Sequence, residues 1–316
     1  MLEMQRIVAR GVVLFCLFWL VSVTTVSFAA ENSALIAVVL SDNIQPYNDA
    51  VKGFKNYLSQ RKTNIKTVDY ALNEYKENEL TGVVDKILSN KQNLIFTIGT
   101  YATKAIQKSA RDTSVVFAMV LTPDKVGVSP PGVIMDIPSA VKFDNLKKIL
   151  PSVRKVGFIY SADSLSLFEE AVEAGNKFGF QIIGKRIDSG KEFPSAFEDI
   201  AGQIDCFLMV ADAKIYFPKS VEYLLRESCD RNIPVVGLSS NYVKAGALVS
   251  FDCDYEDLGE QAAELALKIM EDGGSLNAQF VTPRKVKFAL NLRVVEMLDI
   301  KIPAGVLKEA SEVFGK

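Results

Sequence analysis

The chain has 316 residues and a formal net charge of −2, with 23% charged and 49% hydrophobic residues. That length is more than one hydrophobic core normally organises, so it predicts two domains. No basic block stands out, which argues against nucleic acid and anionic membrane surfaces as partners. The sequence has no histidine, which excludes Ser-His-Asp and Cys-His nucleophiles and removes the commonest zinc ligand.

The first residues have the pattern of an export signal. Arg6 and Arg10 precede an uncharged stretch, 11–30, whose centre is strongly apolar. Small residues at Ser27 and Ala29 then provide the positions that a signal peptidase requires. An uncleaved anchor is the alternative, because about twenty uncharged residues can span a bilayer. Polar residues dilute the far end of the stretch, so we predict a signal peptide over 1–29 and a periplasmic mature protein.

Short apolar runs rich in Val, Ile and Phe alternate with segments of helical period. This is the pattern of parallel strands joined by crossover helices. In the first half of the chain, we predict strands at 35–40, 65–70, 94–98, 115–121 and 133–136. The predicted helices of the first half are at 46–60, 78–88 and 104–110.

The second half repeats the order of the first. The apolar run and polar loop of 36–41 return at 156–161, and later runs pair 93–98 with 205–210 and 114–118 with 233–237. Helices are predicted at 165–178, 192–200, 218–229 and 256–271, the last ending at Asp272-Gly-Gly274. We therefore predict an α/β protein of two Rossmann-like lobes with parallel sheets, facing each other across a cleft.

The predicted lobes are discontinuous in sequence. The N-terminal lobe takes 30–138 and about 253–278, and the C-terminal lobe takes 139–252 and about 279–316. Extended connections are expected near 136–141 and 251–254, with a third near 279–284. Several such connections make a hinge, because each bends while the lobes stay rigid.

Three cysteines remain after the predicted cleavage. Cys206 lies in an apolar strand and is expected to be a small buried hydrophobe. Cys229 and Cys253 could form a disulfide in an oxidising compartment, but an odd number without dense spacing is not a disulfide framework. The sequence leaves that bridge open.

Ligands of open parallel α/β sheets bind beyond the carboxyl ends of the strands. The loops at those ends are rich in hydroxyls, carboxylates and tyrosines, which favours a small polar or zwitterionic ligand held without a cofactor or metal. The predicted ligand-binding residues are Ser41, Asp42, Asn43, Tyr47, Gly99, Thr100, Tyr101, Thr122, Asp136, Tyr160, Ser161, Asp163, Asp212, Ser239 and Asn241.

These residues also have purely structural interpretations. Each hydroxyl could cap the helix that follows it, and Asp163 is as well placed for a cap as for a ligand contact. Tyr47 could instead pack its own helix against the sheet. The acidic residues 254, 256 and 257 are interpreted as the first turn of a helix, where the dipole favours them, and not as a metal site.

An ordered series of segments resembles the ABC-transporter substrate-binding proteins. The series comprises 234–248, 254–263, Leu290-Asn-Leu292 and Ile300-Lys-Ile-Pro303, and it extends back through 150–160 and 98–100. The branch includes tryptophan and tyrosine uptake proteins with the type I periplasmic binding protein fold. The resemblance implies a monomer that captures a small solute, amino acids included, by hinge closure and delivers it to an ABC permease in the inner membrane.

The sequence departs from that family inside the expected pocket. The family often has Asn-Pro-Gly after the position of Tyr160 and Pro at the position of Tyr101, whereas this chain has Ser161-Ala-Asp163 and a tyrosine. Alanines also flank Asp212. The fold and role therefore transfer better than the identity of the ligand does.

Two other functions remain as alternatives. A periplasmic sensor could use the same fold to present a solute to a membrane signalling receptor. A hydrolase could use Asp42, Asp163 or Asp212, but without histidine or metal-ligand spacing we predict that the chain is not an enzyme.

Overall fold

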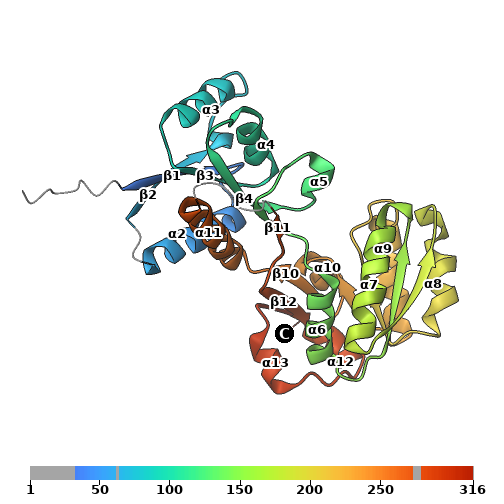
Figure 1. The fold of residues 1–316 in the computed structure, drawn as a ribbon. Coiled ribbons are helices and arrows are strands. Elements are labelled where there is room, and N and C mark those ends of the chain that lie inside the picture. The colour runs from blue at the N-terminus through green and yellow to red at the C-terminus, as the bar shows by residue number, and fades with distance from the viewer. Residues whose placement is uncertain (1–32, 62–63, 273–278, 316) are drawn as a thin grey trace, which may run out of the picture.

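The computed structural model describes residues 33–61, 64–272 and 279–315, which form two α/β lobes (Figure 1). The predicted signal peptide, 1–29, and the glycines at 273–274 lie outside the described residues. No helix in the described part of the chain is long and apolar enough to cross a membrane.

The first lobe is built on a six-stranded sheet with the order β11-β5-β4-β3-β1-β2. All its strand pairs are parallel. Sheets of this kind are covered on both faces, which explains why β3 is buried along its whole length. The strands are β1 (Ala34–Leu40), β2 (Ile65–Ala71), β3 (Leu94–Ile98), β4 (Ser114–Val120), β5 (Gly132–Ile134) and β11 (Phe280–Val281).

Helices cover both faces of this sheet (Figure 1). They are α2 (Gln45–Gln60), α3 (Leu80–Ser89), α4 (Thr100–Ser109), α5 (Pro123–Val126) and α11 (Tyr255–Glu271), with a 3₁₀ turn at Leu72–Glu74. The backbones of α2 and α11 approach closely: a Cβ on Gly53 would lie 1.9 Å from the carbonyl oxygen of Glu256, and one on Gly259 would lie 1.9 Å from that of Ala50. This contact fixes α11, which follows the second lobe in sequence, to the first lobe.

The second lobe has a seven-stranded sheet with the order β13-β12-β10-β9-β8-β6-β7. Its pairs are parallel except β10 with β12. The strands are β6 (Lys155–Tyr160), β7 (Gln181–Arg186), β8 (Cys206–Leu208), β9 (Val235–Gly237), β10 (Val249–Cys253), β12 (Val286–Asn291) and β13 (Glu312–Phe314). The helices are α6 (Ser139–Ile149), α7 (Leu165–Phe178), α8 (Phe193–Ala201), α9 (Pro218–Asp230), α10 (Ser240–Ala245), α12 (Leu292–Met297) and α13 (Ala304–Glu309), with 3₁₀ turns at Ala162–Ser164 and Gly190–Glu192.

The chain passes between the two sheets three times. It leaves the first sheet after β5, returns after β10 into α11, and leaves again between β11 and β12. Since β11 pairs with β5, the third connection lies at 282–285, which overlaps the expected 279–284. It is anchored to α11, because the buried carboxylate of Asp257 accepts hydrogen bonds from Arg284 Nε at 2.9 and 3.1 Å.

The α/β class with two parallel-strand sheets is confirmed, but two details differ from expectation. The segment after Asp136 is not an extended connection up to residue 141, because α6 begins at Ser139. The alternative of a bridge between Cys229 and Cys253 is wrong, because both are free thiols, as is the buried Cys206. The Cys253 thiol instead donates a hydrogen bond to the carbonyl oxygen of Met135, at 3.2 Å.

Candidate functional site

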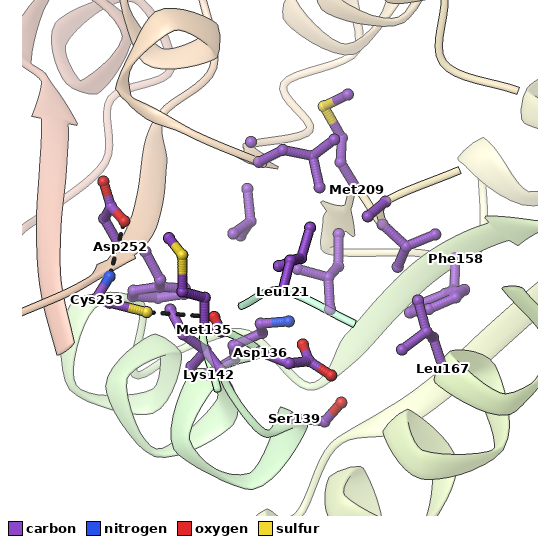
Figure 2. Close-up of a pocket in the computed structure, with 18 residues that line it drawn as sticks. Leu121, Met135, Asp136, Ser139, Lys142, Phe158, Leu167, Met209, Asp252 and Cys253 are labelled. Carbon is purple, nitrogen blue, oxygen red and sulfur yellow. Dashed lines mark hydrogen bonds between the residues drawn. The ribbon is translucent and has the colours of Figure 1, made fainter. Parts of the chain in front are cut away.

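A cavity of about 270 Å³ lies beside the connections between the two lobes, at the predicted hinge (Figure 2). We call it the hinge cavity. Leu121 reaches it from the loop after β4 in the first lobe, and residues 135–137 of the first connection form one wall. The rest of the lining comes from the second lobe, from α6, α7, strand β6 and the carboxyl ends of β8, β9 and β10. The cavity is therefore built from both lobes and the connection between them, at the place where ligands of open α/β sheets bind.

The strands of the second lobe contribute four large apolar side chains to the lining. Phe158, Leu208, Val236 and Phe251 each come from a different neighbouring strand, and none is more than 7% exposed. Leu167 of α7 joins them beside Phe158 (Figure 2). The size is close to the lower end of the range typical of ligand pockets, about 300–1,000 Å³. The cavity therefore suits a small molecule with an apolar part.

Two opposite charges meet at the hinge side of the cavity. Asp136 lies two residues beyond β5, and Lys142 projects from the first turn of α6. Within the described residues, neither side chain has a hydrogen-bond or ion-pair partner. Burial raises the pKa of the Asp136 carboxyl, Lys142 lowers it in part, and Glu170 raises it further. An unpaired acid beside an unpaired base can hold the two charges of a zwitterion.

The start of α6 is held in place by α7. The backbone N–H of Ser139 donates to Glu170 Oε1 at 2.6 Å, which satisfies one of the free donors of the helix N-terminus. Phe143, Leu146 and Ile149 then bury one face of α6. This packing fixes the first turn, and with it the Cα of Lys142, beside the cavity.

Of the predicted binding residues, only Asp136 lines this cavity. The first-lobe residues gather instead where β1 and β3 meet α4. The Ser41 hydroxyl donates to the carbonyl oxygen of Ile98 at 2.8 Å and accepts from the N–H of Ala102 at 2.9 Å. Gly99 has φ +83°, and a Cβ there would lie 2.6 Å from the Tyr47 hydroxyl. These contacts join the strand ends to the helices that follow them.

The other first-lobe residues have varied surroundings. Asp42 is exposed and accepts hydrogen bonds from the N–H of Asn43 and the side chain of Asn73. Burial raises the pKa of the Tyr47 hydroxyl, and Asp42 raises it further. Thr100 is half-buried at the start of α4, whereas Tyr101 is 51% exposed and Thr122 is exposed before α5.

The predicted second-lobe residues form a separate group after β6 and β8. Asp212 is 6% exposed and accepts hydrogen bonds from the hydroxyls of Ser161 and Ser164. Asp163 pairs with Lys214 at the surface, at 2.8 Å. Tyr160 stacks on Phe168 with ring centroids 4.2 Å apart. Farther along, Ser239 precedes α10 without capping it through its side chain, and Asn241 is exposed on that helix.

Sequence reasoning missed Leu121 as an individual contact and Lys142 altogether. Lys142 went unnoticed because the helix that carries it was not predicted. A signal was present, since Phe143, Leu146, Ile149 and Leu150 have helical spacing. The sequence alone does not indicate that the first turn of this helix lies beside the cavity at the strand ends.

Residues 35–314 match the model of the family described as ABC transporter substrate binding protein. The chain belongs to this family. A relative, the tyrosine-binding protein of Clostridioides difficile (strain R20291), is 23% identical over 268 residues, which cover 80% of this chain and 77% of that protein. The family resemblance expected from the sequence is thus confirmed.

Solved structures of other substrate-binding proteins share the fold. One is the ligand-free, open structure of a substrate-binding protein with adhesive properties from Clostridium difficile. Its TM-score is 0.69 at 21% identity, and the match covers 90% of this chain and 100% of that one. The ABC domain from Streptococcus pneumonia in complex with L-Trp has a TM-score of 0.51 at 20% identity, covering 89% of this chain and 100% of that one. The architecture is that of the type I periplasmic binding proteins. Members of such a family bind solutes and generally catalyse no reaction.

Proposed function

We propose that this chain is the periplasmic receptor of an ABC importer and that it captures an amino acid between its lobes. The observation that carries the proposal is the hinge cavity, where an unpaired Asp136 and an unpaired Lys142 stand beside an apolar lining. The names of the two relatives, one for tyrosine and one in complex with L-Trp, support the same class of solute.

The two charges would hold the backbone groups of the amino acid. The Asp136 carboxylate pairs with the α-ammonium group, and the Lys142 ammonium pairs with the α-carboxylate. Both side chains are half-buried, so water screens these pairs less than it would at the surface. The apolar part of the ligand then packs on the second-lobe strands.

Closure of the hinge completes the site. Leu121 belongs to the first lobe and is 55% exposed in this structure, although it already lines the cavity. Rotation of the lobes toward each other would bury it against the ligand. The ligand stabilises the closed state to the extent that it binds that state more tightly than the open one.

Two of the predicted strand-end residues outside the cavity belong to this proposal as closing contacts. Tyr101 is exposed at the start of α4, and Asn241 is exposed at the start of α10. One lies in each lobe, at the carboxyl side of a strand. Hinge closure brings such loops toward the ligand from opposite sides.

Binding is tested on residues 30–316 with the L-amino acids. Trp19 is the only tryptophan and lies in the predicted signal, so the mature protein has no tryptophan emission to mask that of L-tryptophan. A ligand at a hundredfold its Kd should raise the stability by about 2.7 kcal/mol. Small-angle scattering should then show a smaller radius of gyration. Failure of every amino acid to bind contradicts the proposal.

Uptake is tested in cells. Deletion of the gene should reduce the uptake of the labelled amino acid that binds in vitro, and the wild-type gene should restore it. The Asp136→Asn variant, with its weaker affinity, should restore uptake only at higher concentrations of the amino acid. Normal uptake in the deletion strain, with loss of a transcriptional response to the same solute, would favour the sensor instead.

A further inference from the structure

Among the described residues, the part of the cavity lining that comes from β6, β8 and β9 includes no polar side chain. Phe158, Leu208 and Val236 of these strands are buried. Leu167 lies beside Phe158 (Figure 2). Any hydroxyl that enters this region leaves water without gaining a side-chain partner. An unsatisfied buried hydroxyl is costly.

The remaining polar side chains of the lining either have hydrogen-bond partners already or lie beside Asp136 and Lys142, the proposed partners of the ligand's charged groups. Asp252 accepts hydrogen bonds from the Tyr255 hydroxyl at 3.0 Å and from the N–H of Cys253 at 2.8 Å. The Cys253 thiol donates to a backbone carbonyl. Ser139 lies on the same turn of α6 as Lys142 and near Asp136 (Figure 2).

From this arrangement we infer that the cavity selects an amino acid whose side chain is apolar to its tip. Phenylalanine, leucine and methionine belong to this class, and tyrosine does not. The inference rests on the proposed function, because the head group at Asp136 and Lys142 is what directs the side chain toward Phe158 and Leu167. L-Tyrosine, although named in a relative, is the weaker ligand for this chain.

The preference for L-phenylalanine over L-tyrosine should be moderate, because it comes only from the cost of burying one hydroxyl. A hydrophobic pocket rejects a ligand that only adds a hydroxyl by about a hundredfold, far less than a pocket built to bind a hydroxyl rejects the ligand that lacks it. L-Phenylalanine and L-tyrosine differ by that single group. Their affinities should therefore differ by roughly ten- to a hundredfold.

Calorimetric titration of the mature protein with L-phenylalanine, L-leucine and L-tyrosine tests the inference. The expected result is that L-phenylalanine binds roughly ten- to a hundredfold more tightly than L-tyrosine. Equal affinities, or tighter binding of L-tyrosine, would overturn the inference and leave the proposed receptor function standing. Failure of all amino acids to bind would overturn both.

Two variants at Leu167 test whether the ligand side chain lies beside this residue. Leu167 is half-buried on α7, so substitution there leaves the strand core intact. Leu167→Gln places an amide where a tyrosine hydroxyl can reach it and should lower the preference for L-phenylalanine several-fold. Leu167→Met keeps the site apolar and should preserve the preference. Thermal melting checks that both variants are folded. If they then show the same ratio of affinities for L-phenylalanine and L-tyrosine, the inferred position of the ligand side chain is contradicted.

Discussion

Ser161 and Asp212 join the loops that follow β6 and β8. The Ser161 hydroxyl donates to Asp212 Oδ2 at 2.7 Å, and the Ser161 N–H donates to the same oxygen at 3.2 Å. The N–H of Lys214 donates to Oδ1 at 3.0 Å. A buried carboxylate with this many donors is stable in its ionised form, so the network fixes the shape of these two loops.

Replacement of Asp212 by alanine should destabilise the protein. It leaves the buried hydroxyls of Ser161 and Ser164 without their acceptor, and we expect a loss of about 2–3 kcal/mol in the free energy of unfolding. Urea denaturation measures this loss. The matched control is Asp163→Ala, because Asp163 is an exposed partner of Lys214 and should matter by less than about 1 kcal/mol. Equal effects would contradict the role assigned to the network.

The same carboxyl should contribute to acid sensitivity. Burial of Asp212 opposes its ionisation, but hydrogen bonds from Ser164, Ser161 and the N–H of Lys214 outweigh this and hold its pKa below the ordinary value. A lowered folded-state pKa gives stability that is present above the unfolded value of about 3.9 and is lost as the pH falls toward the folded value. The destabilisation caused by Asp212→Ala should therefore shrink below about pH 4.

Asp136→Asn should weaken amino-acid binding without weakening the fold. The variant loses a charge-assisted pair with the ligand ammonium, worth about 1.5–3 kcal/mol, or roughly tenfold or more in Kd. In the free protein the ionised carboxyl is desolvated and has a raised pKa, so its removal should leave the free energy of unfolding unchanged or raise it. Calorimetry and urea denaturation measure the two effects. Lower stability together with unchanged affinity would contradict the assignment.

The raised pKa of Asp136 also predicts a pH dependence of binding. The carboxyl must be ionised to hold an ammonium group, so affinity should fall as the pH drops from neutral toward that raised pKa. The fall should begin at a higher pH than an ordinary aspartate would give. Calorimetric titrations at several pH values test this, and Asp136→Asn should remove the dependence.

Leu121→Ala should lower ligand affinity with little effect on the free protein. Leu121 is 55% exposed in the free protein, and burial of a leucine against the ligand stabilises by up to about 1.5–3 kcal/mol. We expect a loss of about tenfold in affinity, measured by calorimetry. Leu307→Ala, on α13 and 38% exposed, is the control and should leave binding unchanged. No difference between the two variants would exclude Leu121 as a closing contact.

Arg284→Met should weaken the contact between the third connection and α11, and so destabilise the protein. The Asp257 carboxylate is 2% exposed, and Arg284 is 41% exposed. Because Lys285 also reaches Asp257, at 2.9 Å, and solvent screens Arg284, we expect a loss of only about 1–2 kcal/mol. Arg226→Met, which breaks an exposed pair with Glu227, should have almost no effect in the same urea titration. A similar loss for both variants would contradict the claim that Arg284 fixes the third connection to α11.

The central strands and most helices were predictable because their signal is local. Strand β3 and helix α7 have the bounds expected from the sequence, 94–98 and 165–178. Buried parallel strands are continuous apolar runs, and covering helices have a strong 3.6-residue period. Strand β7 was not predicted, because its residues 181–186 are largely half-buried or exposed at the edge of the sheet.

The site was less predictable because its contacts are distant in sequence. Asp212 followed from the strand-end rule, but its partners Ser161 and Ser164 lie 51 and 48 residues away. Lys142 is one of many lysines in the sequence, and only the packing of α6 against α7 places it beside Asp136. The rule identifies the edge where ligands bind, but it does not say which side chains remain unpaired there.

The most direct test of the central claim is a crystal structure of residues 30–316 with the amino acid that binds most tightly. The account predicts that the lobes close and that the ligand occupies the hinge cavity. Its ammonium group should contact Asp136, its carboxylate should contact Lys142, and Leu121 should cover it. A ligand bound outside this cavity, or lobes that keep their present arrangement around it, would contradict the account.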